Sequence, residues 1–457
     1  MPLGRSGRTE QAGLTEARLP HCGGLHTRDG SVDYFQIAGG KRLRGTVEIS
    51  GSKNAALPIM AASILCEGEV VLHNVPDLAD VRSMEVLLNK LGVATSREAG
   101  GTVRLKVQDE MNCHADYELV RKMRASVCVM GPLLAKRHKA QVSMPGGCNI
   151  GDRPINLHIA GLTGLGADTD LMSGDLLLKA KRLTGAELFL GGPFGSTVTG
   201  TANILMAATL AEGRTVIESA ACEPEVTDLA NFLKACGAQI SGEGSPRITV
   251  DGVKQLKGCE YTIIPDRIEA GTFMIAGAIT NGDIHLRNCR LEHLLAVVDR
   301  LRQIGVNIER EGEEVVVSSS RRLEPTTVTS QPYPGFPTDL QAQIMALLCL
   351  ADGNSIITEK IYPDRFMHVA ELNRLGAVLR KEGPTVIVEG VKRLIGAPVM
   401  ASDLRASAAL VLAGLVAKGE TTVNRVYHID RGYERIERKL RPLGADIERL
   451  NRATEDS

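Results

Sequence analysis

The sequence predicts an α/β protein made of two lobes, each containing three repeated units packed around buried central helices. The first observation behind this prediction is a repeat of roughly 70 residues, which is too long for a common solenoid and long enough for a complete α/β unit. The second is a helix-length apolar segment in each of the six copies. One unit cannot bury such a helix alone. We therefore expect three units to pack their helices together in one lobe, and the other three to do the same in a second lobe.

Each copy opens with a segment that is apolar on nearly all sides. A helix of that composition must be buried, so we expect three of these helices at the centre of each lobe. The six segments are residues 54–65, 124–135, 201–210, 269–279, 339–350 and 405–417.

Glycines divide the rest of each copy. A turn and a short strand follow the apolar segment, and an amphipathic helix then closes the copy on a glycine, which suits a left-handed C-cap. Five copies open the strand with a glycine, namely Gly68, Gly213, Gly282, Gly353 and Gly419. The closing glycines are Gly92, Gly166, Gly237, Gly305, Gly376 and Gly444.

Composition argues against several classes of function. The 457 residues carry 53 Lys plus Arg against 54 Asp plus Glu, and only 3% are aromatic, so we expect no nucleic-acid partner and no binding to a membrane surface. No stretch approaches the roughly 18 consecutive apolar residues of a membrane helix. Residues 1–34 lack the apolar run of a secretion signal and are expected to form a disordered tail.

The ten cysteines include no CxxC pair, which favours a reduced, cytoplasmic protein. Most lie in apolar runs, where a buried thiol acts as a small hydrophobic group. Cys148 differs, because it follows Pro145-Gly146-Gly147 and precedes Arg153. Nearby positive charge lowers the pKa of a thiol and makes it reactive. From the loop alone, a structural turn is an equally good interpretation.

Charged or amide residues stand at the beginnings of five of the six apolar segments. Helix N-termini present unpaired N–H groups and a partial positive charge, so basic residues there make a site for phosphate or carboxylate. Individually, Asp339 could be an N-cap, Lys53 a solvated residue, and Arg153, Arg365 and Arg431 surface ion-pair partners. Recurrence at one structural place favours a binding site. The charged starts are Lys53 with Asn54, Arg124, Asp266 with Arg267 and Glu269, Asp339, and Asp403 with Arg405.

Four longer motifs closely resemble one known family. They are residues 51–58 (GSKNAALP), 145–154 (PGGCNIGDRP), 335–343 (GFPTDLQAQ) and 428–434 (HIDRGYE). Several long motifs in the correct order are far more specific than one short pattern. They resemble the bacterial UDP-N-acetylglucosamine enolpyruvyl transferases, also called UDP-N-acetylglucosamine 1-carboxyvinyltransferases, over about residues 35–450.

This resemblance implies an inside-out α/β barrel fold with two lobes that close around substrates. One lobe would combine residues 35–52 with 264–457, and the other would span residues 53–263. The implied reaction moves the enolpyruvyl group of phosphoenolpyruvate to the 3-hydroxyl of UDP-N-acetylglucosamine and releases phosphate, without a metal or organic cofactor. It is the first committed step of peptidoglycan synthesis, on which cell wall biogenesis, cell shape and cell division depend.

The resemblance also implies catalytic roles for five residues. Cys148 matches the family's proton donor to C3 of phosphoenolpyruvate. Asp339 matches the residue facing the sugar 3-hydroxyl, where a carboxylate could accept a proton. Lys53 and Arg431 match residues that hold the anionic substrate, and Asp403 matches a second acid at the catalytic site.

Further positions match substrate-binding residues of the family. Two departures bear on the expected uridine contacts, because Asn156 stands where many members carry Asp and residues 196–200 (STVTG) differ from the usual run. The implied substrate-binding residues are Lys53, Asn54, Arg124, Arg153, Pro154, Ile155, Asn156, Leu157, Thr197, Val198, Asp339, Ile361, Arg365 and Arg405.

Two alternatives stay open. The shikimate-pathway enolpyruvyl transferase shares the fold and phosphoenolpyruvate, but it has a different lysine run and lacks the Pro-Gly-Gly-Cys loop. A catalytically silent paralogue that binds nucleotide sugar as a regulator is the other, and the joint presence of Lys53, Cys148, Asp339 and Arg431 argues against it. The sequence leaves the oligomeric state open.

The expected role of Cys148 leads to a labelling prediction. Fosfomycin, an epoxide that mimics phosphoenolpyruvate, alkylates the cysteine of the resembled family. We expect one fosfomycin adduct per chain by intact-mass analysis, and none in the Cys148→Ala variant. Labelling at another of the ten cysteines would show that Cys148 is not the reactive thiol.

Overall fold

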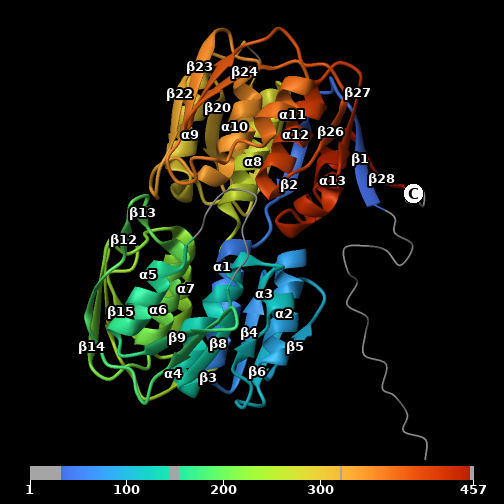
Figure 1. Ribbon diagram of the computed structural model, residues 1–457. Helices are drawn as coiled ribbons and strands as arrows, with labels where there is room; N and C mark the ends of the chain where they lie inside the picture. Colours follow the sequence, from blue (N-terminus) through green and yellow to red (C-terminus); the bar gives the residue numbers. More distant parts are fainter. Residues whose placement is uncertain (1–31, 145–153, 320–321, 453–457) are drawn as a thin grey trace, which may run out of the picture.

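The computed structural model describes residues 32–144, 154–319 and 322–452, and it has two lobes (Figure 1). The lower lobe in that view has a hydrophobic core of buried residues between Ala55 and Ile264. The upper lobe has a second core, which combines Phe35–Ile49 with residues from Ile268 to Ile447. This grouping supports the predicted lobe boundaries near residues 53 and 264. The boundaries themselves stay a prediction.

Three helices fill the centre of each lobe, as expected from the apolar segments. Contacts between them join all three in each lobe, and nearly all of their residues are buried. In the lower lobe they are α1 (Lys53–Ala62), α4 (Met130–Arg137) and α6 (Val198–Ala208). In the upper lobe they are α8 (Arg267–Ile279), α10 (Gln341–Leu348) and α12 (Leu404–Val416).

Some predicted helix ends are wrong because short 3-10 turns replace them. The clearest case is residues 124–135, where a 3-10 helix precedes α4 and disturbs the regular bonding. Asn203 of α6, which is fully buried, compensates by donating to the Val127 carbonyl (2.8 Å) and accepting from the Gly131 amide (2.8 Å). A Cβ at Gly131 would lie 2.2 Å from the Asn203 carbonyl oxygen, so this close helix packing requires glycine.

The 3-10 helices are η1 (Ser63–Leu65), η2 (Arg124–Val129), η3 (Leu291–His293), η4 (Thr338–Leu340), η5 (Val426–Arg431) and η6 (Arg441–Leu443).

Six four-stranded sheets surround the central helices in the described part of the chain, one for each unit. All six share one topology: the first strand runs parallel to the second, and the other pairs are antiparallel. The orders are β18-β4-β6-β5, β7-β8-β10-β9, β11-β14-β16-β15, β2-β19-β21-β20, β22-β23-β25-β24 and β26-β27-β1-β28. The predicted sixfold repeat is therefore visible as six copies of one sheet.

The strands of the lower lobe are β3 (Cys66–Glu67), β4 (Glu69–His73), β5 (Val93–Arg97), β6 (Val103–Val107), β7 (His114–Ala115), β8 (Lys139–Ser143), β9 (Asp168–Met172), β10 (Asp175–Lys179), β11 (Glu187–Phe189), β12 (Gly191–Gly192), β13 (Gly195–Ser196), β14 (Arg214–Glu218), β15 (Gln239–Ser241), β16 (Arg247–Asp251), β17 (Leu256–Lys257) and β18 (Glu260–Thr262). Those of the upper lobe are β1 (Val32–Ala38), β2 (Arg44–Glu48), β19 (Asp283–Arg287), β20 (Asn307–Glu311), β21 (Glu314–Ser318), β22 (Thr327–Ser330), β23 (Asn354–Glu359), β24 (Val378–Glu382), β25 (Thr385–Glu389), β26 (Pro398–Met400), β27 (Glu420–Asn424) and β28 (Asp446–Arg452).

The N-terminal strands complete the upper lobe before the chain enters the lower one. β2 pairs in parallel with β19, and β1 lies between β27 and β28. The chain returns beside its own exit, because the Ser52 amide donates to the Ile264 carbonyl (2.7 Å) and the Asp266 amide donates to the Ser50 carbonyl (2.8 Å). The two lobes are thus joined by a pair of adjacent, hydrogen-bonded segments.

Amphipathic helices close the units, and the predicted glycine C-caps are confirmed. Each of the six closing glycines has a positive φ, between 81° and 106°. The helices before them are α2 (Ala79–Lys90), α5 (Asn156–Gly164), α7 (Pro224–Ala235), α9 (Leu295–Ile304), α11 (His368–Arg374) and α13 (Ile436–Leu440), and one further short helix is α3 (Tyr117–Val120). Within the described ranges, no helix has both the length and the apolar character needed to cross a membrane.

Candidate active site

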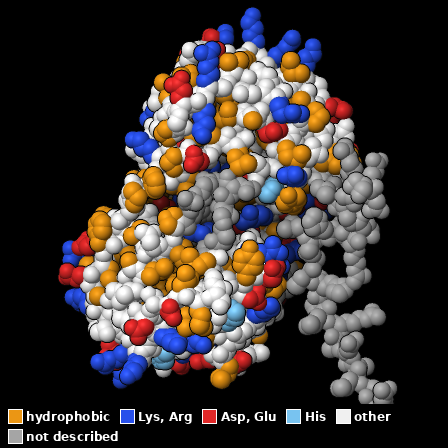
Figure 2. Space-filling view, in the orientation of Figure 1, with side chains coloured by type: hydrophobic (Ala, Val, Ile, Leu, Met, Phe, Trp, Pro, Cys, Tyr) orange, Lys and Arg blue, Asp and Glu red, His pale blue; other side chains and the backbone are white. Residues whose placement is uncertain are grey.

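Charged side chains from both lobes meet at the N-terminal ends of central helices. Lys53 begins α1 at the top of the lower lobe, while Asp339 precedes α10 and Arg405 is the second residue of α12 in the upper lobe. Figure 2 shows Lys and Arg side chains where the two lobes meet. We call the following residues the charge cluster: Lys53, Asp80, Asp339, Arg365, Arg405 and Arg431.

Both oxygens of the Asp339 carboxylate are engaged by arginines. Arg365 Nη1 donates to Oδ1 (2.8 Å), and Arg405 donates to Oδ2 through Nε (3.2 Å) and Nη2 (3.1 Å). Burial alone would raise the pKa of Asp339, but the charges of Arg405 and Arg365 outweigh it and hold the pKa far below its usual range. Asp339 is therefore firmly ionised and a weak base in this arrangement.

Arg405 packs against Tyr433. Its guanidinium lies over the ring of Tyr433, 5.3 Å from the centroid, and its side chain is only 1% exposed. The Tyr433 hydroxyl is fixed in turn by Thr272 (2.8 Å) and Gln343 (3.1 Å). Arg405 Nη1 is buried and has no hydrogen-bond partner among the described residues, so one donor of this guanidinium is unsatisfied.

A second group of charges joins the two lobes. The Asp80 carboxylate accepts from Lys53 Nζ (3.1 Å) and from Arg431 Nε (2.9 Å), and Asp80 and Lys53 belong to the lower lobe while Arg431 belongs to the upper. Burial lowers the pKa of the Lys53 ammonium, and the Asp80 charge partly opposes that effect. Burial would raise the pKa of Asp80, but Lys53 and Arg431 keep it below its usual value.

Sequence reasoning missed Asp80. It is the second residue of α2 and is 4% exposed, although it lies among apolar neighbours that face the core. An acidic residue near a helix start is ordinary, so only its position on the apolar face of α2 could have marked it. Its partners lie 27 and 351 residues away, and no local pattern connects them.

The structure decides three of the open interpretations. Lys53 is 8% exposed and paired with Asp80, so it is not a solvated residue. Asp339 makes no capping hydrogen bond at the start of η4 or α10, so the N-cap interpretation is wrong. Asp403 does cap α12, because its Oδ1 accepts from the amides of Arg405 (2.9 Å) and Ala406 (3.1 Å). Arg365 is 7% exposed and paired with Asp339, so it is not a surface arginine.

The residues expected on the nucleotide side lie at two adjacent helix starts of the lower lobe. Asn156 and Leu157 begin α5, which packs on α6, and Pro154 and Ile155 precede them. Thr197 caps α6 by accepting from the Gly200 amide (3.2 Å), so that helix begins at Val198 rather than at the predicted residue 201. Ile361 lies in the upper lobe, four residues before Arg365.

Two of the predicted site residues, Cys148 and Arg153, lie outside the described residues. Arg124 begins η2, and Asn54 is the exposed second residue of α1, next to Lys53. Around the described part of the charge cluster, no group of three or more His, Cys, Asp or Glu side chains is arranged to hold a metal ion.

The lobes also touch beside the charge cluster. Arg267 pairs with Glu225 (2.9 Å), and both side chains are at most 10% exposed. The Tyr333 amide of the upper lobe donates to Glu223 of the lower lobe (3.5 Å). These contacts bring the charged helix starts of the two lobes together around one site.

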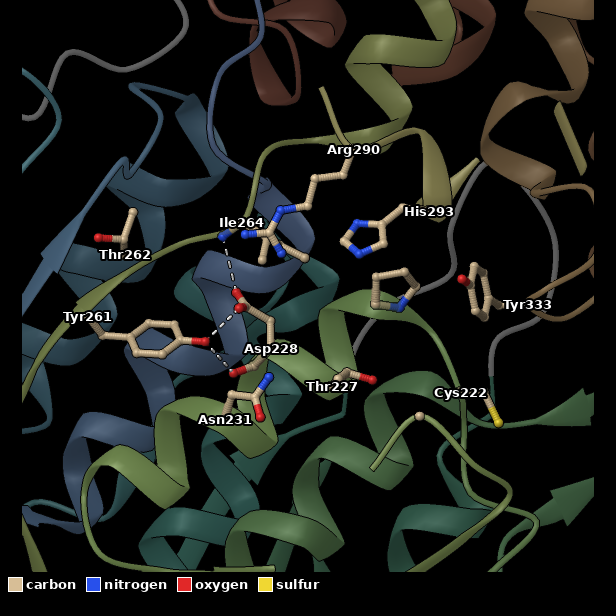
Figure 3. Close-up of a pocket in the computed structure, with 12 residues that line it drawn as sticks. Cys222, Thr227, Asp228, Asn231, Tyr261, Thr262, Ile264, Arg290, His293 and Tyr333 are labelled. Atoms are coloured by element: carbon tan, nitrogen blue, oxygen red, sulfur yellow. Dashed lines mark hydrogen bonds between the residues drawn. The ribbon is translucent and has the colours of Figure 1, made fainter. Parts of the chain in front are cut away.

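A separate cavity of about 560 Å³ lies beside the segments that join the lobes (Figure 3). Asp228 contributes a carboxylate to its lining: burial raises the pKa of Asp228 to about 6, although Tyr261 and the Ile264 amide donate to its carboxylate. Arg290 and His293 face it from the upper lobe. None of the residues predicted for the active site lines this cavity.

Comparisons with known proteins agree with this geometry. The family model for EPSP synthase (3-phosphoshikimate 1-carboxyvinyltransferase) matches residues 37–440. The solved enolpyruvyl transferase NikO from Streptomyces tendae superposes with a TM-score of 0.83 at 24% identity, covering 92% of this chain and 100% of that one. EPSP synthase from Acinetobacter baumannii superposes with a TM-score of 0.71 at 19% identity, covering 92% and 100%. The chain therefore has the enolpyruvyl transferase fold, which confirms the predicted fold class.

Sequence relatives are more specific. The UDP-N-acetylglucosamine 1-carboxyvinyltransferase of Methylacidiphilum infernorum (isolate V4) is 53% identical over 419 residues, covering 92% of this chain and 99% of the relative. The protein of the same name from Nitratidesulfovibrio vulgaris (strain DSM 19637 / Miyazaki F) is 54% identical over 420 residues, covering 92% and 100%. The chain belongs to the family of UDP-N-acetylglucosamine 1-carboxyvinyltransferases and is a transferase, as the motifs predicted.

Removal of the Asp80 charge should loosen the contact between the lobes. In Asp80→Asn, Lys53 and Arg431 lose their shared carboxylate, and breaking a buried ion pair costs about 3–5 kcal/mol. We expect a larger radius of gyration by small-angle X-ray scattering without substrates. Asp77→Asn is the matched control, because Asp77 precedes α2 and accepts from Arg82 of that helix (2.6 Å). An unchanged radius in Asp80→Asn would show that Asp80 does not hold the lobes together.

Proposed function

We propose that this chain transfers the enolpyruvyl group of phosphoenolpyruvate to the 3-hydroxyl of UDP-N-acetylglucosamine, with release of phosphate. The observation that carries the proposal is the charge cluster, in which four cationic side chains and two carboxylates from both lobes meet at helix N-termini. Relatives 53% to 54% identical bear the name of this activity. The reaction would take place in the cytoplasm, as the first committed step of peptidoglycan synthesis.

The cationic side chains suit a small substrate that carries both phosphate and carboxylate. Guanidinium groups hold such anions through paired hydrogen bonds, and Arg405 Nη1 already lacks a partner among the described residues. Lys53 presents a compact charge that can follow the phosphate as negative charge grows on it during departure. Arg124 and Arg153 are proposed to complete the anion site from the lower lobe, and Arg365 and Arg431 from the upper.

Asp339 is proposed as the base that accepts the proton of the 3-hydroxyl. The two arginines that lower its pKa would hinder this role if they stayed in place. An anionic substrate competes for the same guanidinium groups, so its binding would draw Arg405 and Arg365 away from the carboxylate and raise the pKa of Asp339. The base would then become effective only when phosphoenolpyruvate is present.

The chemistry proceeds by addition and elimination. The sugar oxygen bonds to C2 of phosphoenolpyruvate as Asp339 takes its proton, and Cys148 delivers a proton to C3, which gives a tetrahedral intermediate. The C2–O bond to phosphate then breaks and C3 loses a proton, which leaves the enol ether. Asp403 is proposed as a second acid near these steps, and closure of the lobes excludes water.

The nucleotide sugar is proposed to bind along the starts of α5 and α6. Pro154, Ile155, Asn156 and Leu157 would contact it from one helix start, and Thr197 and Val198 from the next. Asn54 from α1 and Ile361 from the upper lobe would complete the contacts. Because both lobes contribute, binding of the sugar would favour closure before phosphoenolpyruvate is held.

Assay of phosphate release from phosphoenolpyruvate tests the function. We expect release with UDP-N-acetylglucosamine and none with shikimate 3-phosphate as acceptor. Loss of the base in Asp339→Asn should lower kcat by about 100- to 10,000-fold. Asp352→Asn is the control, since Asp352 pairs with Arg322 on the exposed surface of the upper lobe, and its kcat should stay near that of the wild type.

Each other result has a defined meaning. Release only with shikimate 3-phosphate would support the shikimate-pathway activity. No release with either acceptor would support a catalytically silent paralogue. Full activity of Asp339→Asn would be consistent with the proposed reaction, but it would show that Asp339 is not the base.

A further inference from the structure

A fully buried carboxylate lies behind the charge cluster. Glu359, the last residue of β23, is 0% exposed and accepts four hydrogen bonds. Its Oε1 accepts from the Ser330 hydroxyl (2.5 Å) and from the amides of Ile361 (2.8 Å) and Tyr362 (3.0 Å). Its Oε2 accepts from the Thr338 hydroxyl (2.9 Å).

These donors belong to the segments that carry the site. The amides of Ile361 and Tyr362 begin the loop that leads to Arg365, and Thr338 directly precedes Asp339. One carboxylate therefore fixes the two segments that present the arginine and the acid to each other. In the described ranges no ion pair neutralises Glu359, so its burial carries a desolvation cost that neutral donors must offset.

The Thr338 hydroxyl sets the order of donors and acceptors in these hydrogen bonds. A hydroxyl has one proton to donate, and Thr338 donates it to Glu359 Oε2. The free lone pairs of the same oxygen accept from Arg365 Nη1 (3.1 Å). That nitrogen also donates to Asp339 Oδ1 (2.8 Å), so the bonds run in sequence from Glu359 through Thr338 and Arg365 to Asp339.

We propose that Glu359 is a positioning residue, which places Arg365 at the anion site beside Asp339 by fixing the proton of the Thr338 hydroxyl. The proposal rests on the proposed function, in which Asp339 is the base and Arg365 helps to hold phosphoenolpyruvate. Glu359 does not touch the reacting atoms. It acts by setting the direction in which the Thr338 hydroxyl donates its proton. If Glu359 only stabilised the fold, that direction would not affect activity.

The Glu359→Gln variant separates polarity from shape. Its amide oxygen can still accept from the amides of Ile361 and Tyr362, so the loop should keep its path. Its NH2 group would donate toward Thr338, so the threonine proton would turn toward Arg365, which also donates. We expect kcat for phosphate release to fall about 10- to 100-fold, with little change in the melting temperature. Thr338→Val should have a similar effect.

The double variant Glu359→Gln/Thr338→Val tests whether the two residues act as one chain. We expect it to lose no more activity than Thr338→Val alone, because the chain is already cut. Ser330→Ala is the matched control: it also removes a donor to Glu359, but one not bonded to Arg365, and its kcat should fall less than about threefold. The proposal would be overturned in favour of a structural role by either of two results. One is a double variant whose loss of kcat is the product of the two single losses, and the other is a loss of kcat in Ser330→Ala as large as that in Thr338→Val.

A readout without turnover keeps this test separate from the proposed function. In NMR spectra of protein labelled with 15N-arginine, Glu359→Gln and Thr338→Val should shift the Arg365 guanidinium signal in the same way, and Ser330→Ala should not. Unshifted Arg365 signals would contradict the positioning role even in an active enzyme. A wild-type chain without phosphate release would instead contradict the function proposed for the whole site.

Discussion

The structure depends most on the Asp339 carboxylate between Arg365 and Arg405. An ionised acid whose side chain is 26% exposed meets two almost fully buried guanidinium groups at the point where central helices of the upper lobe begin. Such burial is tolerated only when the charges are paired and their remaining donors and acceptors are satisfied. Tyr433, Gln343 and the Glu359–Thr338 contact supply most of that support, and Arg405 Nη1 is a donor that has no partner among the described residues.

The lower lobe contributes a buried ion pair of its own. Lys53 shares Asp80 with Arg431, and of these two ion pairs only the one between Asp80 and Arg431 crosses from one lobe to the other. The anion site is therefore divided between two rigid cores that are joined by one pair of adjacent segments. A substrate that carries two anionic groups can engage both halves at once, which couples its binding to closure.

Much of the fold could be predicted because its signals are local. Neighbouring residues are enough to show an apolar segment of helical length or a glycine in a left-handed C-cap, and both signals recur six times. The charged helix starts marked Lys53, Asp339 and Arg405 for the same reason. Asp80 and Glu359 were missed, because a buried acid gains its meaning from partners that only the folded chain brings near. The 3-10 start before α4 was missed for a similar reason, since it depends on Asn203 from another helix.

The central claim is that the anionic substrate turns Asp339 from an ion-pair partner into a base. The most direct test is a difference infrared spectrum between the wild type and Asp339→Asn, which isolates the band of that carboxylate. Without substrates, we expect the ionised band to persist to the lowest pH at which the protein stays folded. With phosphoenolpyruvate and a UDP-N-acetylglucosamine analogue that lacks the 3-hydroxyl, the band should titrate at a higher pH, because the guanidinium groups that lower the pKa are diverted. The same titration in both states would contradict the claim.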